Sequence, residues 1–205
     1  MKIIPYVHFQ DVTIRTSGRT PHWALQGALY SITFRLADAL PRFVQRRLND
    51  EFIHYKRRFP SARREQVADM RQRTNVRLDH ELDRGYGRCS LRGEKVAGCV
   101  ADALLHFHSR RYHLAAWSVM PNHVHALILP IGDNQISEIL HSWKSFTGTE
   151  VNRILGRSGP LWQRDYFDRI IRDERDFEQT MTYIVNNAAK AGLRNWKWQG
   201  VGWRP

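Results

Sequence analysis

The chain is poor in cysteine and has no long apolar run. Cys89 and Cys99 are the two cysteines among 205 residues, and neither has the spacing of a zinc finger or a disulfide framework. No apolar stretch approaches the roughly 18 residues that a membrane-spanning helix requires, and the first residues lack the features of a secretory signal. We therefore expect a reducing, cytoplasmic setting and no membrane partner.

Acidic residues are scarce relative to basic ones. The chain has 20 Asp and Glu against 32 Lys and Arg, which gives a formal net charge of +12. A soluble chain this basic usually meets a polyanion, most commonly nucleic acid. A surplus of arginine that only solvates the surface would give the same composition. The chain also lacks internal repeats, low-complexity tracts and a Gly-Lys-Ser/Thr phosphate-binding loop.

Hydrophobic periodicity predicts alternating strands and helices. Strands are expected over residues 28–36, 112–119, 123–129 and 165–171. Helices are expected over residues 41–58, 63–82, 93–110 and 135–155, with Asp133 or Asn134 as the cap of the fourth. A last helix begins after a capping Asp173, runs to about residue 191 and stops at Gly192.

Without the two charged helices between residues 42 and 87, the order is strand, helix, strand, strand, helix, strand, helix. This order predicts an α+β, ferredoxin-like (RRM-like) fold, in which a four-stranded antiparallel sheet carries helices on one face. We expect a single domain over residues 1–205, with a core at about 28–193 and an inserted charged helical hairpin at about 42–87. The tail at 194–205 alternates tryptophans with cations, so it either stacks on single-stranded bases or folds back onto the domain.

Two histidines lead into a buried strand. His123 and His125 are two residues apart, so on a strand their side chains share one face while Val124 points to the other. Two neutral imidazoles on one rigid face are suitable ligands for a divalent metal.

In the last predicted helix, a tyrosine lies away from the apolar stripe. Phe177, Met181 and Ile184 lie on the apolar side, whereas Tyr183 lies among polar neighbours. Asn187, four residues further on, is adjacent to this tyrosine on the helix surface. A half-exposed tyrosine without a function is equally compatible with this pattern.

Several segments, taken in order, resemble the REP-associated tyrosine transposases, which belong to the insertion-sequence-200-like, single-tyrosine branch of the HUH nucleases. The resemblance extends from about residue 28 to 193, and its ordered segments are residues 30–36, 82–87, 119–125, 161–166, 183–187 and 190–193.

This resemblance implies a site and a reaction. His123 and His125 would be the histidine pair of the HUH motif, Tyr183 the nucleophile, and Asn187 the residue that completes a Mg²⁺ or Mn²⁺ site; the family often has proline where this chain has Ala188. The tyrosine would attack a phosphodiester of single-stranded DNA to give a 5′-phosphotyrosine and a free 3′-hydroxyl. A later attack by a 3′-hydroxyl would rejoin DNA without a nucleotide cofactor, because the covalent intermediate retains the bond energy.

The implied partner is single-stranded hairpin DNA, bound by a monomer or a homodimer. Lys190, about two turns beyond Tyr183, is also a candidate cation to favour the phenolate. The candidate nucleic-acid contacts are Lys144, Arg153, Arg164, Arg169, Arg172 and Lys190.

Two other functions remain open from the residues. A non-catalytic basic module would bind structured nucleic acid equally well without metal. A metallo-phosphoesterase would use a metal-bound water and show turnover without a covalent adduct.

Overall fold

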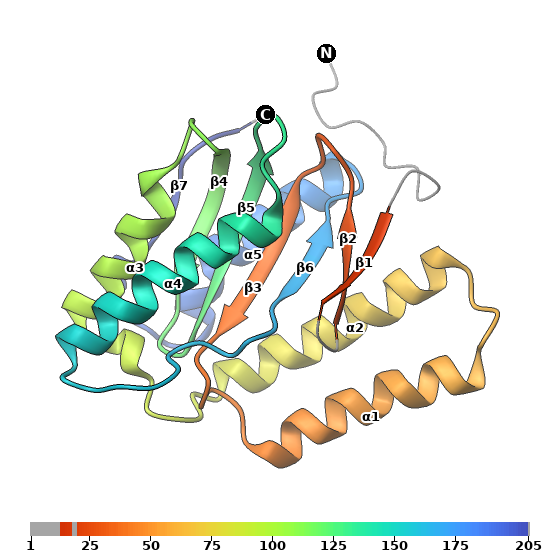
Figure 1. Ribbon diagram of the computed structural model, residues 1–205, viewed down its shortest axis with the longest axis horizontal. Helices are drawn as coiled ribbons and strands as arrows, with labels where there is room; N and C mark the ends of the chain where they lie inside the picture. The colour runs from red at the N-terminus through yellow and green to blue at the C-terminus, as the bar shows by residue number, and fades with distance from the viewer. Residues whose placement is uncertain (1–12, 18–19, 205) are drawn as a thin grey trace.

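The computed structural model describes residues 13–17 and 20–204 (Figure 1). The strands are β1 (Thr13–Ser17), β2 (Thr20–Ala24), β3 (Tyr30–Arg35), β4 (Tyr112–Val119), β5 (His123–Pro130), β6 (Phe167–Ile170) and β7 (Gln199–Val201). The helices are α1 (Arg42–Arg58), α2 (Arg64–Asp83), the short 3-10 helix η2 (Ser90–Arg92), α3 (Glu94–His106), α4 (Ile136–Ile154) and α5 (Glu174–Lys190).

The central sheet of the described residues has the strand order β6-β3-β5-β4-β7 and is antiparallel throughout. The hairpin β1–β2, which the sequence did not predict, forms a separate two-stranded sheet. Figure 1 shows α3 and α4 in front of the central sheet and α5 behind it.

Strand alternation builds a core on each face of the sheet. In β5, Val124, Ala126 and Ile128 belong to the core under α3 and α4, whereas Leu127 belongs to the core under α5. Because a β-bulge interrupts the pairing of β4 near Ala115, this strand can present two successive alanines to the α5 side.

The predicted α+β class with an antiparallel sheet is confirmed, but two details were wrong. The sheet has five strands instead of four, because residues 199–201 of the tail pair with the outer edge of β4. The helices cover both faces rather than one, because the apolar stripe of α5 (Phe177, Met181 and Ile184) packs on the second face of the sheet.

The inserted hairpin is present as α1 and α2, close to its predicted bounds. Leu48 from α1 and Leu78 and Leu82 from α2 are buried in the main core. The hairpin is therefore anchored to the sheet domain at one end, and Figure 1 shows its two helices extending away from that anchor.

The predicted ends of α5 are confirmed, whereas the predicted N-cap of α4 is wrong. Asp173 caps α5 by accepting a hydrogen bond from the backbone of Asp176, and Gly192 ends the helix region with φ +71°. At α4 the N-cap is Gln135, whose side chain makes no capping hydrogen bond. Asn134 does not cap the helix, because its Oδ1 accepts from Arg111 Nε instead and its amide nitrogen donates to the carbonyl of Ile131.

Two predicted elements are shorter than expected. Helix α3 ends at His106 rather than near residue 110, because the chain turns through Ser109 at φ +63° before β4 begins. Strand β6 covers residues 167–170 rather than 165–171, since only Phe167 to Ile170 pair with β3.

The tail folds back onto the domain. The indole of Trp196 donates to the carbonyl of Val119, and Trp203 stacks on His113 with ring centroids 4.6 Å apart. Trp198 packs against the core under α3 and α4. These contacts decide between the two predictions for the tail. Over the described residues, no helix has the length and apolar character to cross a membrane.

Candidate functional site

The histidine pair lies at the start of β5, on the face covered by α5. His123 and His125 are 0% and 2% exposed, and their Nε2 atoms are 2.9 Å apart. Strand register places Thr33 of β3 directly opposite His125, and Thr33 Oγ1 lies 2.9 Å from His125 Nδ1. As predicted, the two rings share one face of the sheet and point to a common position.

The surrounding hydrogen bonds fix the proton on His123. Asn122 donates its amide nitrogen to the carbonyls of Leu82 and Tyr86, so its oxygen must face His123 Nδ1, at 2.7 Å. His123 Nδ1 therefore carries the proton, and its Nε2 presents a lone pair. In this state His125 Nε2 donates to His123 Nε2, and His125 Nδ1 accepts from the hydroxyl of Thr33.

Burial keeps both rings neutral. Desolvation lowers the pKa of His123 well below its usual value, and the neighbouring His125 lowers it further. Desolvation lowers the pKa of His125 to about 3. Neutral imidazoles have the protonation state that metal coordination requires.

Tyr183 projects from α5 towards the histidine pair. Its ring centroid is 5.6 Å from that of His125, in an edge-to-face arrangement, and Lys190 Nζ lies 5.1 Å from the tyrosine ring centroid. The ring is half-buried and packs against the core under α5. Burial raises the pKa of Tyr183 above its ordinary value, the Asp79 carboxylate raises it further, and the Asn187 amide opposes this.

Asn187 is buried, although the helix pattern places it beside Tyr183 and away from the apolar stripe. It is 0% exposed, because this side of α5 faces the sheet. Neither its Oδ1 nor its Nδ2 has a hydrogen-bond partner within the described part of the chain. A buried amide without partners is costly, about 1–3 kcal/mol, and is rare in folded proteins.

These side chains fit a divalent cation by their chemistry. Two imidazole nitrogens and an unpartnered amide oxygen are a donor set that Mn²⁺ accepts readily and Mg²⁺ accepts with water or phosphate oxygens. Within the described residues, no group of three or more His, Cys, Asp or Glu side chains could hold a metal ion. A cation at this position would therefore need the Asn187 oxygen beside the histidines.

The sequence reasoning missed Asp79. This residue lies on α2, 104 positions before Tyr183, and its Oδ2 accepts a 3.0 Å hydrogen bond from the tyrosine hydroxyl. No local motif marks it, because α2 reads from the sequence only as a charged helix. The signal becomes visible only when the inserted hairpin is docked on the sheet domain.

A buried arginine was also missed. Arg35 of β3 pairs in register with His123 and is 8% exposed, so its side chain starts from the same face of the sheet as the histidine pair. Burial lowers its pKa to about 10, so the guanidinium remains protonated at neutral pH. The site therefore borders a fixed positive charge.

The six predicted nucleic-acid contacts fall into two groups. Arg169 is bound to Asp176 and Thr180, and Lys144 donates to the carbonyls of Gln163 and Arg164, so both have structural partners. Arg172 lies 3.6 Å from carboxylate oxygens of both Asp69 and Asp176. The exposed candidates are Arg153, which pairs with Glu150, Arg164 and Lys190.

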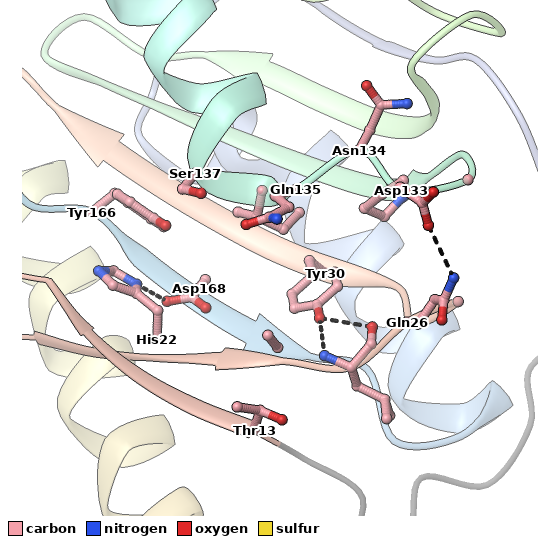
Figure 2. Close-up of a pocket in the computed structure, with 16 residues that line it drawn as sticks. Thr13, His22, Gln26, Tyr30, Asp133, Asn134, Gln135, Ser137, Tyr166 and Asp168 are labelled. Carbon is pink, nitrogen blue, oxygen red and sulfur yellow. Dashed lines mark hydrogen bonds and ion pairs between the residues drawn. The ribbon is translucent and has the colours of Figure 1, made fainter.

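A pocket of about 570 Å³ lies away from this site (Figure 2). Its lining includes His22, whose Nδ1 is 2.6 Å from Asp168 Oδ1, and Tyr166, which stacks on the His22 ring. Asp168 is paired in register with Ile32, whose side chain lies in the core under α3 and α4. The pocket therefore opens on the opposite face of the sheet from the histidine pair.

Comparison with solved structures gives distant likenesses. A structure described as the REP-associated tyrosine transposase bound to a REP hairpin aligns at 17% identity and a TM-score of 0.46, covering 87% of this chain and 79% of that one. A transposase structure from Deinococcus radiodurans aligns at 15% identity and a TM-score of 0.32, covering 84% of this chain and 98% of that one.

Comparison by sequence gives closer matches. The chain is 29% identical over 84 residues to the REP-associated tyrosine transposase of Escherichia coli K12, covering 40% of this chain and 48% of that protein. It is 30% identical over 91 residues to a Haemophilus influenzae protein that is also named as a REP-associated tyrosine transposase, covering 40% of this chain and 52% of that protein. The aligned part thus spans about half the length of these curated relatives.

A family model described as "Transposase IS200 like" matches residues 102–187. This segment contains both histidines, Tyr183 and Asn187, which the fold brings to one face of the sheet. The resemblance of this chain to the REP-associated tyrosine transposases is confirmed, and residues 102–187 are the part that matches the IS200-like transposase model.

Proposed function

We propose that the protein is a transposase that nicks and rejoins single-stranded, hairpin-forming repeat DNA in the cytoplasm. Tyr183 Oη attacks a phosphodiester, which forms a 5′-phosphotyrosine and releases a 3′-hydroxyl. A 3′-hydroxyl then attacks this intermediate, restores a phosphodiester and frees the tyrosine. The covalent link preserves the bond energy, so no nucleotide cofactor is needed.

One observation carries the proposal. Two buried neutral imidazoles direct their Nε2 atoms to one point, and the only tyrosine on α5 has its ring 5.6 Å from one of them. A core tyrosine would not need a pair of buried histidines beside it. All these groups come from one chain, so a monomer suffices for the site, and a homodimer is not required.

His123, His125 and Asn187 would hold the divalent cation, Mg²⁺ or Mn²⁺. When bound, it would polarise the scissile phosphate and neutralise charge that develops there. Asn122 keeps the lone pair of His123 Nε2 directed at the site. The hydroxyl of Thr33 can accept a hydrogen bond as well as donate one. His125 can therefore carry its proton on Nδ1, facing Thr33, which leaves the lone pair of Nε2 for the cation.

The charge distribution supports a DNA partner. The net charge of +12 attracts a polyanion over long distances. Arg35 is on the histidine face, where it can contact the scissile phosphate, and Lys190 lies over the tyrosine ring. Arg153 and Arg164 are exposed, where they can contact the flanking phosphates.

A covalent-adduct assay tests the proposal. Labelled hairpin DNA with a single-stranded flank is incubated with the protein and Mn²⁺ and resolved by denaturing electrophoresis. We expect a protein–DNA band that disappears with Tyr183→Phe and with chelator. Tyr55→Phe, on α1 with its hydroxyl bound to the backbone of Gln66, is the matched control and should retain the band.

The same gel addresses the two other functions. Cleavage without an adduct would identify a metallo-phosphoesterase that uses water as the nucleophile. DNA binding that is unchanged by chelator and by Tyr183→Phe, with no cleavage, would identify a non-catalytic binding module. Either result would contradict the proposed reaction.

A further inference from the structure

The inserted hairpin brings a carboxylate into the site. Asp79 lies on α2, and its Oδ2 accepts the hydrogen bond from Tyr183 Oη at 3.0 Å. Its second oxygen, Oδ1, is buried and has no hydrogen-bond partner within the residues that the structure describes. A carboxylate with one oxygen on the tyrosine and the other unsatisfied is not explained as a structural ion pair.

Burial and the neighbouring charges together set the protonation state of Asp79. It faces Tyr183 on α5 and Arg169 on β6, and Asp83 lies one turn further along α2. Burial is the largest effect and raises the pKa of Asp79 to about 7, while the Tyr183 hydrogen bond and Arg169 act in the opposite direction. Lys190 acts on Asp83 and so offsets part of the second acidic charge.

We propose that Asp79 is the general base of Tyr183, an inference that rests on the proposed function. As Oη attacks phosphorus, the Oη–H bond breaks and the proton passes to Asp79 Oδ2. The P–O3′ bond breaks at the same time, and the departing 3′ oxygen takes up a proton from solvent. In the rejoining step Asp79 returns its proton to Oη as the P–Oη bond breaks and the incoming 3′-hydroxyl loses its own proton to solvent.

The geometry meets the requirement for such a role. A general base must lie within hydrogen-bond distance of the proton that it removes, and Asp79 already accepts from that hydroxyl. A base is needed because the hydroxyl of a buried tyrosine stays protonated at neutral pH. The inserted hairpin α1–α2 would then supply a catalytic side chain rather than only a surface.

The pH profile of adduct formation in Asp79→Asn tests the assignment. The amide preserves size and can still accept from Oη, but it cannot take the proton. With wild-type protein, the single-turnover rate on hairpin DNA should rise with pH and level off above about pH 7, where Asp79 is ionised. Asp79→Asn should be slower by about 100-fold or more and should lose this inflection.

Asp69→Asn is the matched control, because it removes an exposed carboxylate from the same helix. It should keep the wild-type rate within about twofold and the same profile, since surface pairs contribute little. If Asp79→Asn reacts at the wild-type rate, Asp79 is not a base. If it is slow but keeps the inflection near pH 7, Asp79 only positions Tyr183, and the proposal is overturned.

A second measurement needs neither DNA nor the Asn variant. In protein with ¹³C-labelled tyrosine rings, the Tyr183 signal is identified by its loss in Tyr183→Phe. It should shift with an inflection near pH 7 as the hydrogen-bonded carboxyl of Asp79 titrates. Absence of the shift overturns the inference, whereas a normal shift with no wild-type adduct would show that the Asp79–Tyr183 contact exists and that the proposed function fails, and the role of base with it.

Discussion

Replacing Asp79 with asparagine should stabilise the protein at neutral pH while it impairs the reaction. The carboxyl has a pKa of about 7 in the fold, against about 3.9 in an unfolded chain. Between these values the native state binds more protons than the unfolded state, so stability falls as pH rises from about 4 to 7. Three pH units at about 1.4 kcal/mol each give a cost of at most about 4 kcal/mol.

Urea unfolding at pH 5, 6, 7 and 8 measures this effect. The free energy of unfolding of Asp79→Asn minus that of wild type should grow by about 2 kcal/mol between pH 5 and 7 and level off by about pH 8. Replacing the carboxylate by an amide also changes the hydrogen bond with Tyr183, which adds a difference in stability that does not vary with pH. The change of the difference with pH is therefore the quantity that tests the prediction. Asp69→Asn should show a difference that does not vary with pH. If the difference for Asp79→Asn is flat or decreases with pH, the assignment of Asp79 as a buried carboxyl with a raised pKa is refuted.

Three further substitutions test the framework of the fold and site. Tyr112→Phe removes a buried hydroxyl that accepts from the indole of Trp143, and we expect a loss of about 1–3 kcal/mol in urea unfolding; an unchanged midpoint would contradict this bond. Asn122→Ala releases the proton of His123 Nδ1 from its acceptor and should weaken Mn²⁺ binding about 10–100-fold in titration calorimetry, whereas equal affinity would show that the ring needs no such support. Gly87→Ala should lose at least about 1 kcal/mol in thermal unfolding, because φ is +80° and the new Cβ would clash with the carbonyl oxygen of Asp38; a neutral result would mean that this turn can move.

Local chemistry made much of the fold predictable. The strand at residues 123–130 could be recognised from its aliphatic run, and because side chains alternate along a strand, the sequence also placed His123 and His125 on one face. The cap at Asp173 and the stop at Gly192 depend only on neighbouring backbone groups, so the ends of α5 could be read from the sequence.

The parts that could not be predicted depend on contacts between distant segments. Asp79 meets Tyr183 across 104 positions, and nothing near Asp79 distinguishes it from the other charges of α2. Asn187 reads as a surface residue from helix spacing, but the second face of the sheet buries it. The tail was ambiguous because alternating tryptophan and cations suit both nucleic-acid stacking and packing on a sheet edge.

The pairing of β7 with β4 has a consequence for handling the protein. β7 lies along residues 116–118 of β4, where it satisfies backbone groups that an outer strand would otherwise leave open. Shortening the protein before Gln199 would uncover that row of amides and carbonyls and create a template for strand addition by another molecule. Truncated forms should therefore self-associate, and affinity tags are better joined through a spacer that leaves residues 199–201 in the sheet.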